Sequence, residues 1–116
     1  MIEVMDKKEI QLLRALVERL SKNEADEIVR CGQNGALSKD EIEGAINDYP
    51  GVIVPPPDEA YDNIVEYDIY DISSGARKVE FDLWYDGEES DLTLLVDISR
   101  SCNGDYVIRI DDIHVL

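Results

Sequence analysis

The second half of the chain alternates apolar residues with carboxylates. The pattern is clearest in residues 65–69, which read VEYDI, and in residues 79–83, which read VEFDL. Successive side chains of a β-strand point to opposite faces of a sheet, so this alternation predicts strands with one apolar face and one acidic face. Such a sheet must bury its apolar face against another layer, while its acidic face stays in contact with water.

Four strands of this kind are expected, at about 63–72, 77–86, 91–99 and 105–115. The segments between them are short and rich in serine, glycine, asparagine and aspartate, which is typical of hairpin loops: 73–76, 86–90 and 101–104. Short loops join antiparallel neighbours, so the four strands form a meander. The apolar segment 52–54 is compatible with an edge strand, and the proline triplet 55–57 favours an extended connector over a docking motif.

The first fifty residues predict three helices that cover the apolar face. Each is expected to begin with a capping box, in which a serine or aspartate stands three residues before a glutamate, at 6–9, 21–24 and 38–41. Apolar residues at helical spacing, such as Ile10 and Leu13, give the first helix a face to bury. The expected fold class is therefore α+β, with three N-terminal helices packed on a four-stranded antiparallel meander sheet.

Length and composition place residues 1–116 in a single α+β domain, because a chain of this size holds one hydrophobic core. Apolar residues make up 44% of the chain and charged residues 33%, which is too apolar for a disordered acidic tail and too charged for a membrane protein. The first residues lack the basic start and apolar run of a signal peptide, so we expect a cytoplasmic protein. Cys31 and Cys102 are then expected to be reduced thiols.

Negative charge is concentrated in the second half. The formal net charge is −16; residues 1–50 hold seven basic and eleven acidic side chains, whereas residues 51–116 hold four and sixteen. A charge of this sign repels phosphates, so direct binding of nucleic acid is not expected. The acidity favours a basic protein partner, although solubility alone is an alternative explanation for an acidic chain.

The phase of the alternation assigns each strand residue to a face. Val65, Tyr67 and Ile69 are expected to share the helix-facing side with Val79 and Phe81. The opposite face then combines carboxylates with an apolar patch, and its candidate partner-binding residues are Glu66, Asp68, Tyr70, Glu80, Asp82, Trp84, Leu95 and Asp97, with Thr93, Val107 and Arg109 beside them. The apolar members have two open interpretations, which are cross-strand packing on a solvated face and, for Trp84, the anchor of an interface.

Residue patterns for catalysis or metal binding are weak. His114 is the only histidine, and its place in an alternating strand favours a structural role over an acid–base role. Neighbouring carboxylates such as Asp111 and Asp112 are expected by chance in a chain with 27 acidic residues. No phosphate-binding glycine loop, HExxH, CxxC or calcium loop is present in the sequence. We therefore predict no enzyme activity, no catalytic residues, no metal and no cofactor.

Two segments carry a resemblance to a known family. Residues 83–94 read LWYDGEESDLTL, and residues 104–116 read GDYVIRIDDIHVL. The tryptophan, the Ser-Asp-Leu-Thr-Leu strand and the Asp-Asp-x-His-Val-Leu ending resemble small bacterial domains from toxin–immunity loci. The resemblance implies an immunity protein of contact-dependent growth inhibition or a related polymorphic toxin system. Such a protein binds and neutralises a cognate toxin domain, and many of these toxins are basic nucleases.

Two other functions compete with this one. The order of helices followed by a meander also resembles the ketosteroid-isomerase-like cone, which implies a domain that binds a small ligand or performs acid–base chemistry. Such a pocket needs polar groups that point inward, and the only hydroxyls expected there belong to Tyr67, Tyr85 and Tyr106. A self-associating domain is the third possibility, because an exposed patch around Trp84 would also suit a homodimer.

Overall fold

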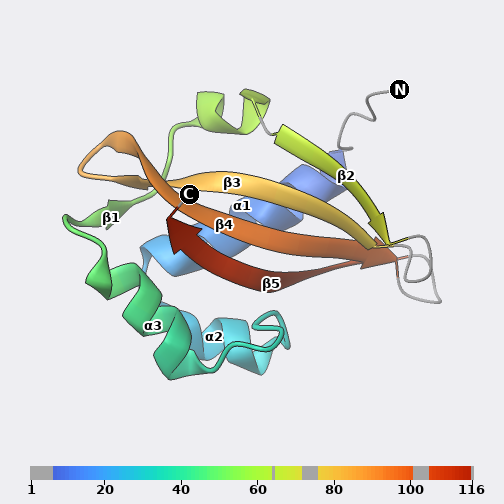
Figure 1. Ribbon diagram of the computed structural model, residues 1–116, viewed down its shortest axis with the longest axis horizontal. Coiled ribbons are helices and arrows are strands. Elements are labelled where there is room, and N and C mark those ends of the chain that lie inside the picture. Colours follow the sequence, from blue (N-terminus) through green and yellow to red (C-terminus); the bar gives the residue numbers. More distant parts are fainter. Residues whose placement is uncertain (1–6, 64, 72–75, 101–104, 116) are drawn as a thin grey trace.

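The computed structural model describes residues 7–63, 65–71, 76–100 and 105–115, with side chains throughout except at 62–77 and at Arg100 (Figure 1). Three helices come first, α1 (Lys7–Ser21), α2 (Ala25–Arg30) and α3 (Lys39–Asp48). The rest is sheet and one 3-10 helix: β1 (Ile53–Val54), η1 (Asp58–Asn63), β2 (Val65–Asp71), β3 (Ala76–Tyr85), β4 (Glu88–Arg100) and β5 (Tyr106–Val115). The predicted α+β class is confirmed. Among these described helices, none is both long and apolar enough to cross a membrane.

All strand pairs of the sheet are antiparallel. β3 pairs with β4 and β4 with β5, while β1 and β2 both lie along the other edge of β3. β2 pairs with the start of β3, and β1 pairs with its end through Ile53 opposite Tyr85 and Val54 opposite Trp84. The predicted meander of four strands is confirmed, and the short segment 53–54 adds a fifth strand at the edge.

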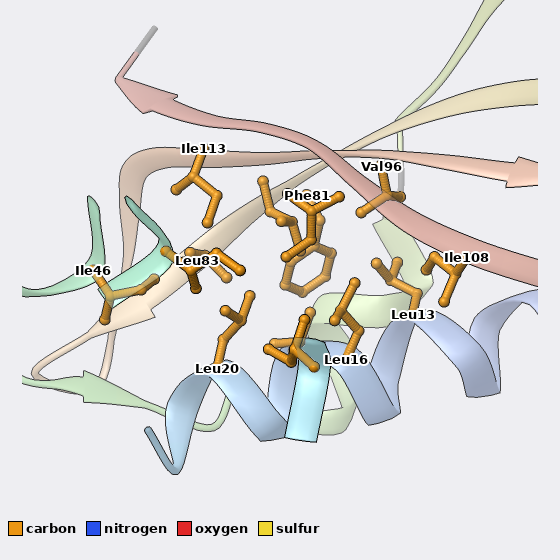
Figure 2. Close-up of a cluster of buried hydrophobic side chains, with 14 of the residues drawn as sticks. Leu13, Leu16, Leu20, Ile46, Phe81, Leu83, Val96, Ile108 and Ile113 are labelled. Carbon is orange, nitrogen blue, oxygen red and sulfur yellow. The ribbon is translucent and has the colours of Figure 1, made fainter. Parts of the chain in front are cut away.

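The core lies between one face of the sheet and the helices (Figure 2). The inner face of the sheet consists of buried alternate residues, as expected for strands β3 to β5: Val79, Phe81, Leu83, Tyr85, Leu92, Leu94, Val96, Ile98, Ile108 and Ile110. From α1, Leu13, Leu16 and Val17 pack against them with none of their surface exposed. Each fully buried side chain of this size contributes about 1.5–3 kcal/mol to folding.

The other described elements also cover the inner face. Tyr85 donates its hydroxyl hydrogen to the Ile46 carbonyl oxygen of α3 at 2.6 Å, and Ile28 of α2 belongs to the same core. Tyr61 of η1 stacks on Phe81, with ring centroids 5.1 Å apart. η1 was not expected from the sequence pattern. The helical elements therefore cover one side of the sheet, and the acidic side is left without a covering layer among the described residues.

The structure describes two of the three predicted capping boxes, and one of these two differs from expectation. At α3 the box is confirmed, because the Glu41 amide donates to Ser38 Oγ and the Ser38 amide donates to Glu41 Oε1, both at 3.1 Å. The capping box predicted at 21–24 is wrong. Ser21 is the last residue of α1 and its hydroxyl donates to the Val17 carbonyl oxygen at 2.9 Å, while α2 follows Glu24 without a side-chain cap. The first predicted box begins at Asp6, outside the described residues.

The loop between β3 and β4 is shorter than predicted. Asp86 and Gly87 alone form the turn, with φ of +54° and +82°, and β4 already begins at Glu88. Two positive φ angles match the tight turn that Asp-Gly favours in hairpins. The prediction of a loop at 86–90 is therefore wrong, because three of its polar residues belong to the strand. The loops predicted at 73–76 and 101–104 fall mainly outside the described residues.

The segment after α2 covers part of the exposed edge of β5. The Ile110 amide donates to the Gln33 carbonyl oxygen at 2.7 Å, and Gly35 lies directly against the Ile110 carbonyl group. Free edges of a sheet can pair with other chains, so this contact protects the middle of the strand. Gly35 has φ of +58°, which a residue with a side chain adopts at a cost.

Replacing Gly35 by alanine should destabilise the protein more than replacing Gly32 by alanine. Both glycines have positive φ, so each alanine bears the cost of left-handed backbone, about 1–2 kcal/mol. Only at Gly35 does the new Cβ collide with a neighbour, the Ile110 carbonyl oxygen, which adds roughly 1–3 kcal/mol. Urea unfolding measures both losses, and equal losses would show that this loop does not rest on β5.

Candidate protein-binding face

The outer face is the side of the sheet opposite the helices. In Figure 1, α1 crosses behind the strands. The strand register brings together Lys78, Glu80, Asp82 and Trp84 of β3, Glu89, Thr93, Leu95 and Asp97 of β4, and Val107, Arg109, Asp112 and His114 of β5. Five of the predicted partner-binding residues, on β3 and β4, therefore share one face: Glu80, Asp82, Trp84, Leu95 and Asp97. Their role in binding a partner stays a prediction.

Apolar side chains lie in the middle of this acidic face. Leu95 stands between Glu80 on one neighbouring strand and Asp112 on the other. Trp84 is half-buried and stands between Val54 of β1 and Glu89 of β4. Both side chains are thus partly accessible and are paired across the sheet with carboxylates, which is the arrangement of an apolar contact with a charged rim.

Asp97 already has an ionic partner within the sheet. The Lys78 ammonium lies 2.7 Å from Asp97 Oδ1 and 3.2 Å from Asp111 Oδ2. Its hydrogen bond to Asp97 is the main cause of a raised pKa for Lys78, so the lysine stays charged. The negative charge of Asp97 is therefore largely compensated inside the protein.

At the other end of the face, two carboxyl groups share a hydrogen bond. The bond between Glu89 and Asp82 raises the pKa of Glu89, and burial and the charge of Asp82 raise it further. Asp82 also accepts a hydrogen bond of 2.8 Å from the Thr93 hydroxyl. Thr93 was expected on the surface of this face, but it is fully buried beneath its neighbours. With Ser90 and Asp91, these residues line an acidic hollow of about 330 Å³.

A β-bulge shapes this hollow. Between two cross-strand pairs, Asp82 with Thr93 and Trp84 with Glu89, β3 has one residue and β4 has three. The Ser90 hydroxyl bridges the irregularity, since it donates to the Leu83 carbonyl oxygen and accepts from the Leu92 amide at 3.2 Å. Bulges redirect side chains away from strict alternation. The polar pair Ser90-Asp91 interrupts the apolar alternation in the sequence, and that interruption is the signal by which the bulge could have been found.

The bulge is followed by a contact between the sheet and α3. Asp91 accepts a hydrogen bond from the hydroxyl of Tyr49, the residue after α3. This bond, together with burial, raises the pKa of Tyr49. The Tyr49 ring also lies 4.6 Å from the Tyr85 ring, centroid to centroid. Asp91 therefore belongs to the acidic hollow and to the helix–sheet boundary, a position that the sequence analysis did not assign to it.

The expected alignment of β2 with β3 is wrong. The register pairs Val65 with Glu80, Glu66 with Val79 and Tyr67 with Lys78, whereas the sequence analysis matched Val65 and Tyr67 with Val79 and Phe81. A slip of one residue reverses the phase of a strand, and short polar loops leave that register weakly determined. The register thus places Glu66 opposite Val79 of the inner face, against its expected place on the outer face. The side chains of Glu66, Asp68 and Tyr70 lie outside the described part of the structure, and their role in binding a partner stays a prediction.

Basic residues are confined to one end of the sheet. All four of the second half, Arg77, Lys78, Arg100 and Arg109, occupy register positions at the start of β3, the end of β4 and the first half of β5. The stretch 81–97 contains six carboxylates and no lysine or arginine. The uncompensated negative charge therefore gathers at the end that holds the acidic hollow.

His114 and the carboxylates do not form a metal site in the described residues. The His114 Nδ1 atom lies 3.0 Å from Asp112 Oδ2, and its strand partner is Thr93. No group of three or more histidine, cysteine or acidic side chains is arranged to hold a metal ion in the described ranges. The outer face therefore combines charged residues with an apolar centre, and its described residues hold no metal-binding cluster.

Comparison with protein families gives one match, which covers residues 13–116. The protein belongs to the DUF7668 family. This family is described as a domain of unknown function, and the match takes in most of the helical layer and the whole sheet. Searches with this chain among curated proteins and among solved structures found no match.

Replacing Glu89 by glutamine should stabilise the DUF7668 domain at neutral pH. The raised pKa of Glu89 means that the folded state binds its proton more tightly than the unfolded state, so wild-type stability falls as the pH rises from the ordinary value of 4.5 through the raised pKa. Glutamine removes the repulsion with Asp82 and should add up to about 0.5 kcal/mol at pH 7, since the pair is exposed to solvent.

Chemical unfolding at several pH values measures this gain, and the gain should shrink toward pH 4. Glu88→Gln is the matched control, because it removes the same charge from an exposed position one residue away. A gain of equal size in both variants, or one that does not change with pH, would contradict the interaction with Asp82 that raises the pKa of Glu89.

Proposed function

We propose that this protein is an acidic binding module that binds and neutralises a basic protein partner. The observation that carries the proposal is the outer face of the sheet. Its carboxylates surround Trp84 and Leu95, and the helical elements all pack on the opposite side. In the described part of the chain, this face is left uncovered and carries charged residues around an aromatic side chain. Such a face is suited to a protein interface.

Charge would act before contact. With a net charge of −16 and its carboxylates concentrated near Asp82 and Glu89, the protein attracts a basic surface and orients it toward this end of the sheet. Electrostatic steering of this kind raises association rates by about 10–1,000-fold at low ionic strength. Fast association is the property that a neutralising protein needs most, because its target must be captured before it acts.

The apolar centre would act after contact. Tryptophan side chains that become fully desolvated in an interface frequently carry a large share of its binding energy, and the surrounding polar residues exclude water from them. Trp84 and Leu95 are the side chains of the outer face that fit this role. Differences in affinity between related complexes lie mostly in the dissociation rate, so this patch would determine how long the complex survives.

The biological form of this function is taken from the resemblance of residues 83–94 and 104–116 to domains of toxin–immunity loci. We propose that the partner is a cognate toxin domain of the basic, nuclease type, and that the protein acts as its immunity protein. Blocking an active site by binding requires no chemistry from the blocker. The observed acidity, the uncovered face and its apolar centre all support this form of inhibition.

Replacing Trp84 by alanine separates an interface anchor from a structural tryptophan. Because Trp84 lies outside the core, its loss should lower the free energy of unfolding by about 1 kcal/mol or less, the scale of a cross-strand pair. Affinity for the partner should fall by at least about 2 kcal/mol, the scale of a hot spot. Trp84→Phe keeps a ring and should lose less affinity.

The partner is first recovered by the full-length chain from an extract of the source organism and identified by mass spectrometry. Titration of the purified partner with wild type, Trp84→Ala and Trp84→Phe then gives the affinities, and urea unfolding gives the stabilities. Unchanged affinity in Trp84→Ala would place the interface elsewhere. A loss of several kcal/mol in unfolding would show that Trp84 is a core residue.

A further inference from the structure

A second hollow lies next to the acidic one, at the end of the molecule where α3 meets the sheet. It is a groove of about 520 Å³ whose walls include Ala45, Tyr49, Leu92 and Val115. Val115 is 54% exposed, although it is a large apolar residue, and Ala45 and Tyr49 are half-buried. The groove therefore offers apolar surface that the fold itself does not cover.

The groove and the acidic hollow adjoin each other. Asp91 lines both, and the bulge of β4 places Leu92 on the groove side and Thr93 on the acidic side. A ligand that fills one hollow therefore lies beside the other. The two together form a continuous surface with an apolar half and a carboxylate half, which we name the end groove.

The charge around the end groove has one sign. Among the described residues, those that line the two hollows include the carboxylates Asp48, Asp82, Glu89 and Asp91 and no lysine or arginine. The C-terminus of α3 points the negative end of its dipole toward the groove wall at Asp48 and has no basic residue in its last turn. The carboxylates here thus lack the compensation that Lys78 gives to Asp97.

We propose that the end groove binds a segment of the basic protein partner in which an apolar side chain stands next to a lysine or arginine. The apolar side chain would pack against Tyr49, Leu92 and Val115. The neighbouring cation would lie among Asp82, Glu89 and Asp91. This inference rests on the proposed function and adds to it a second contact, continuous with the outer face through Asp82 and Glu89.

Charge complementarity selects this occupant over two others. A second copy of the chain would bring another net charge of −16 to the same carboxylates, so repulsion opposes it. An uncharged apolar ligand would leave Asp82, Glu89 and Asp91 without a counter-charge. A cation among these carboxylates favours the charged form of Glu89, whose pKa is raised by its hydrogen bond with Asp82, so binding should tighten as the pH rises through that pKa. Thr93 and Tyr49 donate hydrogen bonds to these carboxylates, Ser90 lines the same hollow, and the titratable His114 stands opposite Thr93 in the register.

Three short peptides, acetylated and amidated at their ends, serve as probes of the end groove. GRLRG carries both features of the proposed segment, GRGRG lacks the apolar side chain and GQLQG lacks the charges. Each is titrated into the full-length, isotope-labelled protein and followed by NMR. Only GRLRG should shift the methyl signals of Ala45, Leu92 and Val115 together with the amides of Glu89 and Asp91.

Two variants test the position of binding. Ala45→Phe fills the apolar half and should weaken GRLRG binding about tenfold, the equivalent of one buried leucine side chain. Ala15→Phe adds the same ring at an exposed position of α1 and should change nothing. If Ala45→Phe does not fold, Asp91→Asn takes its place, because it removes one charge without adding bulk. Asp91→Asn should weaken the binding of GRLRG and leave the response to GQLQG unchanged.

Several results would overturn the inference. Equal binding of GRGRG and GRLRG would reduce the effect to general charge attraction, and binding of GQLQG alone would assign the groove to an uncharged apolar ligand. Failure of all three peptides to shift the groove signals, or a concentration-dependent dimer that Ala45→Phe abolishes, would also overturn it. The proposed function is tested separately: it fails if the chain binds no basic protein partner. Loss of partner affinity in Trp84→Ala with no loss in Ala45→Phe would keep the function and remove only the end groove.

Discussion

The packing of α1 against the inner face of the sheet is the interaction on which the other features depend. Leu13, Leu16 and Val17 are fully buried against the inner face. Because side chains alternate along a strand, the same alternate residues of the sheet must face these three. A shift of one residue would expose the apolar set and bury the carboxylates, at a cost that no surface interaction could offset. The carboxylates that alternate with these apolar residues stand on the outer face because the apolar residues are held on the inner face. The character of the outer face is thus a direct consequence of how the core is built.

The outer face is not uniform along the strands. Toward the start of β3, Lys78 compensates Asp97 and Asp111, and the remaining basic residues of the second half stand nearby in the register. Toward the β3–β4 turn, carboxylates face one another, and the hydrogen bond with Asp82 raises the pKa of Glu89. Ion pairs lie at the end near Lys78, and uncompensated negative charge lies at the end near Asp82. Uncompensated charge lowers stability, so its concentration beside an apolar groove and a half-buried tryptophan supports a role in binding.

Local sequence patterns predicted the features of the fold that depend on neighbouring residues. They failed for features that depend on contacts between residues far apart in the sequence. The apolar alternation of β3 to β5 assigned both faces correctly, and Ser38 with Glu41 marked the start of α3. The capping box predicted at 21–24 was wrong because α1 continues to Ser21, and Leu20 in its last turn is buried in the core. The phase of β2 and the stacking of Tyr61 on Phe81 depend on pairing across the sheet, and the bulge at Ser90 depends on its bond to Leu83. The acidic face was thus readable from the sequence, whereas the end groove required the structure.

The most direct test of the account compares two charge reversals in partner association kinetics. Glu80→Lys with Asp82→Lys changes the outer face, and Asp40→Lys with Glu59→Lys makes the same change in net charge on α3 and η1. If the outer face receives the partner, the first pair should slow association about tenfold at low salt, and the second pair should slow it far less. The difference should narrow near physiological salt, where screening acts beyond about 8 Å. Equal slowing by both pairs would show that net charge alone attracts the partner, and an unchanged rate in the first pair would contradict the assignment of this face.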